Sequence, residues 1–460
     1  MRLRANQDAV AGRLRNVTFD DSFRTAHWLT CATCVDVPMS QKRSFLGTPG
    51  GLVAANLLVK QARQRRLPME IKLLGNSPLH TYQPGLLFLP FRKPGYRRLA
   101  DIQRPNSDFI GAGVQYLQET ITAIDTQARS VTTDQGTHAY DWLVLALGCR
   151  TVVDAIDGLA ERWGTRAHGF YTPDSALKLA GALDRFEGGD LLVDIADMPI
   201  KCPVAPLEFV CLVDEYLQQR GIRSRTRLTL MTPLSGAFTK PVCNEMLTGM
   251  LQAKGVRIVA DAPLAEVADT TVSCPDGKSV PYDLLVTIPP HEGSDLIDEA
   301  GLGDGLGFGL TDKHTLKAKK AERVFLLGDN TNLPTSKAGS VAHFQAEVVV
   351  HNLLREVAGQ QAEPLADGHT NCFIETGHGK AILVDFNYDI QPVPGEFPLA
   401  GIGPMSLLKE TWLNHLGKLA FKPIYWHLLL PGRSIPLVGS QMSLRGKRMD
   451  VLAAHQHPHA

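Results

Sequence analysis

The sequence predicts an α/β protein built on parallel sheets. Two observations predict this class: short apolar runs typical of strands alternate with helical patterns, and glycine- or proline-rich turns separate them. The composition is that of a folded chain, because 44% of the 460 residues are hydrophobic and 20% are charged. The 47 Lys and Arg residues balance 47 Asp and Glu residues, and this absence of net charge disfavours a nucleic-acid-binding protein.

A first strand–helix–strand unit is expected after residue 43. An apolar run at 44–46 leads into the glycine-rich turn 47–51, a helical pattern covers 52–66, and a second strand covers 69–75. Two strands joined by a helix in this way lie parallel in one sheet. The unit therefore predicts the start of a parallel sheet.

A second unit of the same kind is expected in the middle of the chain. It consists of a strand at 191–197, a helix at 205–221 and a strand at 225–233. The strand-like segment 282–290 is expected to return the chain to the first unit. The other expected elements are a buried strand at 142–147 closed by Gly148, a strand at 322–330 and a helix at 338–357.

Two turns of the first unit suit a nucleotide. Gly47, Gly50 and Gly51 lie between a strand and a helix, where a backbone without side chains lets phosphate approach the helix N-terminus. Asp329 ends an apolar strand and could accept hydrogen bonds from a polyol chain. The alternatives are a plain tight turn at the glycines and a helix-capping role for Asp329.

The corresponding turn of the second unit has no glycine, which argues against a nicotinamide cofactor there. It carries Cys202 beside Lys201, just ahead of a helix, and both neighbours would favour the reactive thiolate. A second cysteine, Cys372, lies in a short segment after the last helix of the core. An inert, buried cysteine is the alternative for each.

No metal site and no secretory signal are expected. Cys31 and Cys34 supply only two of the four ligands of a typical zinc site, so they are interpreted as a chance pair. The N-terminal residues contain no apolar signal core, and no run reaches about 18 apolar residues. A cytoplasmic location, soluble or peripheral on the inner membrane, is therefore expected.

Four long segments, at 80–90, 198–209, 328–347 and 371–388, resemble the sulfide:quinone oxidoreductase and flavocytochrome c sulfide dehydrogenase flavoproteins. The resemblance extends over about residues 44–450. It implies two Rossmann-like domains, FAD as cofactor, a pair of redox-active cysteines facing the flavin, and a C-terminal amphipathic segment on the membrane.

The resemblance also implies roles for individual residues. Cys202 and Cys372 would be the catalytic redox pair, and Lys337 would lie at the pyrimidine edge of the flavin. Many members have a third cysteine near the flavin, and Cys149 is not assigned to that role. The cofactor-binding residues would be Gly47, Gly50, Gly51, Tyr82, Gln83, Pro84, Gly148, Asp329 and Lys337.

The C-terminal segment is expected to contact a membrane and its quinone. Apolar residues recur at near-helical spacing in 405–430, and residues 401–460 contain seven Lys or Arg against two Asp or Glu. The alternative is a helix packed on the protein core or on a second copy of the chain. The expected domains are an extension at 1–40, an FAD-binding domain at 41–158 and 286–365, a second Rossmann-like domain at 159–285, and a C-terminal region at 366–460.

The function implied is an FAD-dependent oxidation of sulfide, with a membrane quinone as electron acceptor. A homo-oligomer is compatible with it. Two alternatives come from other classes: a nicotinamide-dependent flavin reductase, and a non-catalytic scaffold that binds FAD weakly. The first would need a second phosphate-binding loop, and the second is favoured by the shortened glycine turn.

Overall fold

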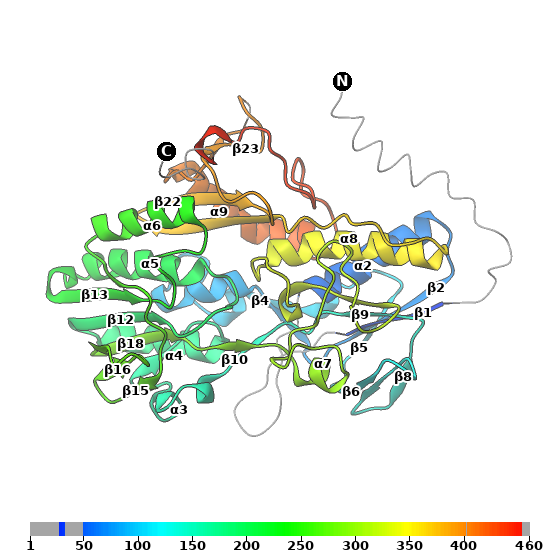
Figure 1. The fold of residues 1–460 in the computed structure, drawn as a ribbon, viewed down its shortest axis with the longest axis horizontal. Coiled ribbons are helices and arrows are strands. Elements are labelled where there is room, and N and C mark those ends of the chain that lie inside the picture. Colours follow the sequence, from blue (N-terminus) through cyan, green and yellow to red (C-terminus); the bar gives the residue numbers. More distant parts are fainter. Residues whose placement is uncertain (1–26, 33–48, 402, 453–460) are drawn as a thin grey trace.

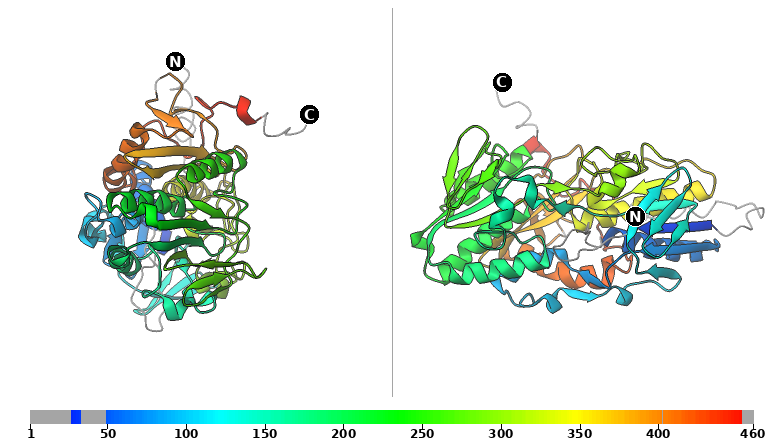
Figure 2. Two further views of the ribbon diagram at one scale, coloured as in Figure 1. Left: turned by 90° about the vertical axis from the view of Figure 1, so that its left-hand side faces the viewer. Right: turned by 90° about the horizontal axis from the view of Figure 1, so that it is seen from below.

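The computed structural model describes residues 27–32, 49–401 and 403–452, with side chains for all of these except 27–32. Two sheet-based halves lie side by side, and the C-terminal residues extend along one long side of both (Figure 1). Figure 2 shows the C-terminal strands at the same edge after a quarter turn. The predicted α/β architecture with two Rossmann-like domains is confirmed.

The first half is a parallel five-stranded sheet in the order β20-β9-β1-β2-β5. Helices α2 and α8 lie next to each other along one face of this sheet (Figure 1). An antiparallel three-stranded sheet, β6-β7-β8, continues from it. The bounds are β1 His27–Ala32, α2 Pro49–Gln64, β2 Met69–Leu74, β5 Val114–Leu117, β6 Ile121–Asp125, β7 Ser130–Thr133, β8 Thr137–Ala139, β9 Trp142–Leu145, β20 Val324–Leu326 and α8 Gly339–Val357.

The central strand of this sheet is not where the sequence predicts it. β1, at His27–Ala32, pairs with β2 on one side and with β9 on the other. The expected extension over 1–40 is therefore wrong at these residues, which belong to the sheet. The expected strand at 44–46 lies outside the described residues. The prediction failed because it required the strand to run directly into the glycine turn, whereas 16 residues separate β1 from α2.

The second half is also a parallel five-stranded sheet, in the order β11-β18-β12-β13-β14. Helix α5 follows β12 and α6 follows β13, as expected for strand–helix–strand units. The bounds are β11 Ala167–His168, α4 Pro173–Arg185, β12 Gly189–Ile195, α5 Ala205–Gln219, β13 Thr226–Met231, α6 Pro241–Ala253, β14 Arg257–Val259 and β18 Leu284–Ile288.

Strand β18 corrects a second expectation. The segment 282–290 does not return to the first sheet, because β18 pairs with β12 and β11 of the second sheet. The boundary expected at residue 285 therefore cuts through a strand. The two chain segments that cross between the halves pair with each other as β10 (Arg150–Thr151) and β19 (His291–Glu292). A short apolar strand fits either parallel sheet equally well, and the sequence pattern does not distinguish them.

The C-terminal region forms a sheet in the order β21-β22-β24-β23, with helix α9 packed against it. Pro423 lies inside α9 and removes a backbone donor, and one turn of π-helix, η8, follows directly. The bounds are β21 Thr370–Gly377, β22 Lys380–Phe386, β23 Gly395–Phe397, β24 Met405–Leu407, α9 Trp412–Ile424 and η8 Tyr425–Leu429.

One hydrophobic cluster continues through both halves and the C-terminal region. It includes Leu58 of α2, Val193 of β12, Ile382 of β22 and Trp426 of η8, all buried. Such a shared core holds the three parts in a fixed arrangement. The remaining elements are β3 Leu79–Thr81, η1 Gln83–Leu87, η2 Leu89–Phe91, η3 Leu99–Asp101, β4 Gln103–Pro105, η4 Asn106–Asp108, η5 Val153–Ala155, α3 Leu159–Arg162, η6 Arg223–Arg225, β15 Glu266–Val267, β16 Thr271–Ser273, β17 Ser279–Pro281, α7 Asp295–Glu299 and η7 Gly328–Asn330.

Candidate active site

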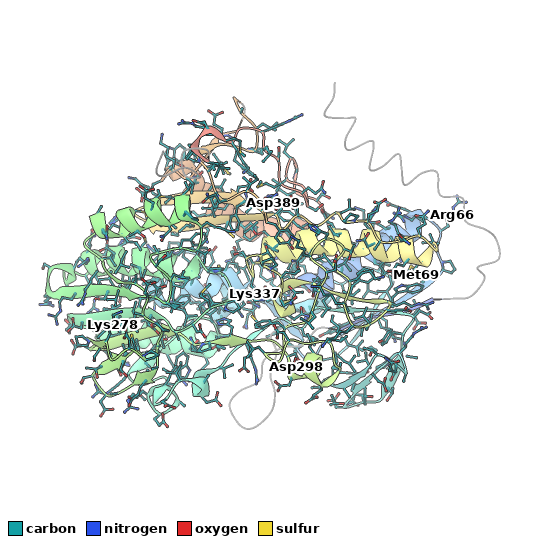
Figure 3. The ribbon with its side chains drawn as sticks, viewed as in Figure 1. Arg66, Met69, Lys278, Asp298, Lys337 and Asp389 are labelled. Carbon is teal, nitrogen blue, oxygen red and sulfur yellow. The ribbon has the colours of Figure 1, made fainter. Side chains whose placement is uncertain are left out.

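A pocket of about 1200 Å³, including its open mouth, lies where the two halves meet the C-terminal region. Its walls come from segments far apart in the chain: the start of α2, η1, the residues before α4, the turn before α5, the turn after β20, the start of α8, β21, α9 and the start of η8. Lys337, one of its residues, lies near the centre of the molecule (Figure 3). Pockets at the junction of α/β sheets are common ligand sites.

The structure brings six of the predicted site residues together in this pocket. Four others do not line it: Tyr82 is buried behind the wall, Gly50 and Gly51 lie inside the first turn of α2, and Gly148 follows strand β9. Gly47 and the side chains of the Cys31 and Cys34 pair lie outside the described residues. The six that line the pocket are Gln83, Pro84, Cys202, Asp329, Lys337 and Cys372.

Cys202 is fixed by its backbone. It has a positive φ of 48°, in the left-handed region that non-glycine residues seldom adopt. Its N–H donates to the carbonyl of Lys337 at 2.7 Å, and its own carbonyl accepts from the N–H of Ala205, at the start of α5, at 2.9 Å. Left-handed non-glycine residues are typical of functional sites, where the surrounding structure holds them in place.

Cys372 reaches the pocket from strand β21, opposite Val384 of β22. Both Cys202 and Cys372 are free thiols, and each is packed against the main hydrophobic cluster. A thiolate at Cys372 acts on Cys202 and raises its pKa, so the two sulfurs lie within electrostatic range. Two cysteines from distant parts of the chain thus share one pocket.

The electrostatics of the thiols differ from the sequence-based expectation. Burial raises the pKa of Cys372 to about 12 and raises the pKa of Cys202 as well. The expected net lowering of the pKa is wrong, because burial outweighs it, and the ammonium that favours both thiolates is that of Lys418 on α9. Residues of the C-terminal helix were not assigned to the thiol site, since the sequence alone does not show which side of the helix enters it.

Glu208 and Lys418 form a buried ion pair in the wall of the pocket. Lys418 Nζ donates to Glu208 Oε1 at 2.6 Å and to the carbonyl of Phe373 at 3.0 Å. The side chains are 1% and 11% exposed, respectively. Neither residue is among the site residues predicted from the sequence. The sequence feature that could have identified each of them is a charged residue with apolar neighbours on both sides, which is typical of a buried, paired group.

A second charged part of the wall carries Asp329 and two lysines, Lys201 and Lys337. Lys337 Nζ donates to the carbonyls of Asp329 and Thr331 at 2.9 and 2.7 Å. Burial lowers the pKa of Lys337 and raises the pKa of Asp329, whereas the two lysines lower the pKa of Asp329. This side of the pocket therefore combines an acceptor for hydroxyl groups with fixed cations.

The start of α2 packs closely on the first sheet. A Cβ on Gly50 would lie 2.2 Å from Leu327 Cδ1, so a larger residue there would displace the buried Leu327 side chain at the strand end. The N-termini of α2 and α8 both reach the pocket, through Pro49 and Gly339. Two helix N-termini favour an anionic group between them.

The third wall is aromatic and comes from the C-terminal helix. Phe421 and Tyr425 line the pocket, and the ring of Tyr425 lies 5.0 Å from that of the buried Tyr82. The Tyr425 hydroxyl lies 2.5 Å from His80 Nε2. On the outer side of α9, Trp412, Leu416 and Leu419 are 61%, 47% and 40% exposed. Within the described ranges, no helix is both long and apolar enough to cross a bilayer.

Comparisons with known proteins point to one group. The chain is 29% identical over 397 residues to the mitochondrial sulfide:quinone oxidoreductase of Dictyostelium discoideum, covering 84% of this chain and 85% of the relative. It is 27% identical over 398 residues to the mitochondrial sulfide:quinone oxidoreductase of Mus musculus, covering 84% and 85%. No family model matches the sequence.

The solved structures agree in fold. The sulfide:quinone oxidoreductase of Aquifex aeolicus superposes with a TM-score of 0.73 at 18% identity, over 88% of this chain and 92% of that one. A ferredoxin reductase from Rhodopseudomonas palustris superposes with a TM-score of 0.57 at 18% identity, over 80% and 84%. These relatives are oxidoreductases, which confirms the predicted enzyme class. Over 84% of its length the chain is similar to sulfide:quinone oxidoreductases, and the resemblance predicted from its sequence is confirmed.

Proposed function

We propose that this chain is an FAD-dependent sulfide:quinone oxidoreductase that oxidises sulfide through Cys202 and Cys372. The observation that carries the proposal is the meeting of these two thiols in one pocket with Asp329 and Lys337. The similarity to sulfide:quinone oxidoreductases supports the same activity. A disulfide between Cys202 and Cys372 is the oxidised form that the proposal requires.

The residues of the pocket fit FAD. Asp329 offers a carboxylate to the hydroxyls of a polyol chain, and the N-termini of α2 and α8 suit a pyrophosphate. Lys337, held by two carbonyls, would supply a fixed cation for the flavin ring. When bound, FAD accepts the two electrons that sulfide oxidation releases and passes them on.

The sulfur chemistry belongs to the two cysteines. A hydrosulfide ion attacks one sulfur of the Cys202–Cys372 disulfide, a new S–S bond forms, and the other cysteine leaves as a thiolate. A small nucleophile, such as a second sulfide, then takes the outer sulfur of the persulfide and frees its cysteine. Removal of two electrons from the two thiolates restores the disulfide. Lys418 stabilises each thiolate, because its ammonium lowers the pKa of both sulfurs.

The aromatic wall is the proposed entrance for a membrane quinone. Phe421 and Tyr425 line the pocket from α9, while Trp412, Leu416 and Leu419 of the same helix face outward. An amphipathic helix with an exposed Trp and apolar face suits the surface of a bilayer. The basic charge that residues 401–460 expose is smaller than the sequence suggests, because Lys418 and Lys447 are buried in ion pairs. A peripheral position on the membrane is therefore part of the proposal.

The test is anaerobic reduction of the purified protein loaded with FAD. Sulfide is expected to bleach the flavin spectrum, and a soluble quinone analogue to restore it. Cys202→Ser and Cys372→Ser are expected to abolish the bleaching, whereas Cys243→Ser, a buried cysteine of α6 outside the pocket, retains it. Bleaching by NADH instead of sulfide would support the flavin reductase alternative. A colourless protein that binds no FAD would support the scaffold.

A further inference from the structure

We propose that Glu208, Lys418, Glu375 and His415 form a proton path that connects the thiol pocket with solvent. The inference rests on the proposed function, since sulfide oxidation is the source of the protons. These charged groups are not needed to hold the cysteines in place, and the inference assigns proton transfer to them.

The inner end of the path lies in the pocket. Glu208 lines the pocket, and its negative charge raises the pKa of both thiols, so it lies close enough to respond to their protonation. Its Oε1 accepts hydrogen bonds from Lys418 Nζ at 2.6 Å and from the backbone N–H of Glu375 at 2.8 Å. The pocket carboxylate is therefore bonded both to α9 and to strand β21.

The outer end of the path lies on α9. The Glu375 side chain is 3% exposed, and His415 Nδ1 lies 2.9 and 3.0 Å from its two oxygens. The His415 side chain is 25% exposed, so the ring joins a buried carboxylate to solvent. Lys418 follows His415 by three residues on the same face of the helix, and its charge acts on Glu375. The ammonium is thus bonded to the pocket carboxylate and lies within electrostatic range of the outer one.

The groups are suited to carry protons. Burial raises the pKa of Glu208 and of Glu375, which makes a transiently protonated carboxyl less costly than on the surface. Tyr96 also faces this row, because Lys418 lowers its pKa and Glu375 raises it. If the charges served only to stabilise the fold, the ion pair of Glu208 and Lys418 would be sufficient. The second buried carboxylate and its histidine continue the row to the surface.

The proposed chemistry supplies the protons. Oxidation of one H₂S to zero-valent sulfur releases two electrons and two protons. The electrons leave through the flavin to the quinone, whereas the protons are released at sulfur atoms inside a largely apolar pocket. One proton passes from H₂S to Glu208 as the attacking hydrosulfide ion forms, is exchanged through the Lys418 ammonium to Glu375, and leaves through His415. The other proton stays on the outer sulfur and leaves with the sulfur product. The carboxylates and the ammonium regain their charges at the end of each transfer.

The experiment is single-turnover reduction of the FAD-loaded enzyme by sulfide, followed by flavin absorbance and by a pH-indicator dye. His415→Ala is expected to slow both flavin bleaching and proton release by about a hundredfold, the lower end of the range for loss of a proton-transfer group. Free imidazole is expected to restore part of the rate. Glu375→Gln is expected to slow the reaction in the same way, without rescue by imidazole.

The matched control is His427→Ala, which removes an exposed histidine of η8, the helical turn that follows α9. It is expected to react as the wild type and to be insensitive to imidazole. Wild-type rates in His415→Ala, or a slow rate that imidazole does not raise, would overturn the proton path while the proposed function stands. Failure of sulfide to bleach the wild-type flavin would instead overturn the proposed function and the path with it.

Discussion

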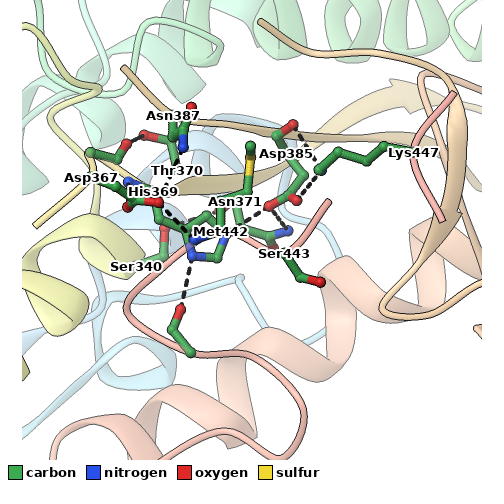
Figure 4. Close-up of polar contacts among 12 residues, drawn as sticks. Ser340, Asp367, His369, Thr370, Asn371, Asp385, Asn387, Met442, Ser443 and Lys447 are labelled. Carbon is green, nitrogen blue, oxygen red and sulfur yellow. Dashed lines mark hydrogen bonds and ion pairs between the residues drawn. The ribbon is translucent and has the colours of Figure 1, made fainter. Parts of the chain in front are cut away.

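Lys447, in the segment after η8, and Asp385 of strand β22 form a buried ion pair (Figure 4). Their side chains are 1% and 2% exposed. His369 Nε2 lies 2.7 Å from Asp385 Oδ1, and Asn371, next to Cys372 on β21, donates to the same oxygen at 3.1 Å. The C-terminal segment is thereby connected to the strand that carries a proposed redox cysteine.

Loss of the Lys447 ammonium is expected to destabilise the protein strongly. Lys447→Met leaves the carboxylate of Asp385 buried with one cation fewer, and breaking a buried pair in this way costs about 3–5 kcal/mol. Urea unfolding of the variant and of wild type measures the difference. Lys409→Met, which removes an exposed lysine of the same region, is the control. A loss below about 1 kcal/mol would show that the pair contributes no more than a surface ion pair.

The sequence predicted those features that depend on local pattern. Strands and helices with a clear period, such as β12, α5, β13 and α8, lie within a few residues of their expected ranges. Similarity in long unusual segments also led to Cys202 and Cys372, which the structure places in one pocket. Neither inference required knowledge of which distant segments meet.

The features that the sequence missed depend on tertiary contacts. The partners Glu208 and Lys418 lie on α5 and α9, and only the folded chain shows that these helices meet. The contact of Tyr82, which is 1% exposed, with Tyr425 of η8 likewise joins segments far apart in the chain. Strand β1 was missed because its spacing from α2 does not follow the usual strand–turn–helix pattern.

Removal of the Glu208 charge is expected to make the reduced thiols more reactive. Glu208 raises the pKa of Cys202 and of Cys372, so Glu208→Gln lowers both and increases the fraction of thiolate, the nucleophilic form. Alkylation by iodoacetamide at pH 8 is expected to accelerate by up to about tenfold for each unit by which the pKa falls, because the thiolate fraction rises tenfold while each thiolate becomes somewhat less nucleophilic. Peptide mapping by mass spectrometry separates the two sites from the other cysteines.

Two further variants make the alkylation result specific. Lys418→Met removes the ammonium that favours both thiolates, and alkylation is expected to slow. Glu215→Gln changes a second carboxylate of α5, which pairs with Lys93 away from the thiols, and is expected to react as the wild type. Equal acceleration by Glu208→Gln and Glu215→Gln would indicate general loosening of α5 rather than loss of a local charge.

Membrane binding is expected to depend on the outer face of α9. Trp412 is 61% exposed, and its transfer to a bilayer surface is worth about 1.5–3 kcal/mol for a large apolar side chain. Trp412→Glu is therefore expected to lower the liposome-bound fraction about tenfold in flotation assays. Leu306→Glu replaces another exposed residue, 55% accessible and outside α9, and serves as the control. An equal loss of binding in both variants would contradict a specific role of the helix.

Asp194 is expected to reduce stability at neutral and alkaline pH. It lies on β12 with no exposed surface, its Oδ2 accepts a hydrogen bond from Thr287 Oγ1 at 2.7 Å, and its Oδ1 has no partner among the described residues. Burial raises the pKa of Asp194 to about 7. In the unfolded chain the pKa of this carboxyl is about 3.9. Between these two pH values the folded protein binds more protons than the unfolded chain.

The free energy of unfolding must therefore fall as the pH rises from about 4 to 7, and stay low above that range. At about 1.4 kcal/mol per unit, the cost of ionising Asp194 approaches ~4 kcal/mol at pH 8. Asp194→Asn keeps an acceptor for Thr287 and never ionises, so its gain in stability over wild type is expected at pH 8 and is absent at pH 4. Urea unfolding at both pH values measures this gain, with the exposed Asp197→Asn as control. A gain of equal size at both pH values would mean that packing, and not the proton, limits stability at this position.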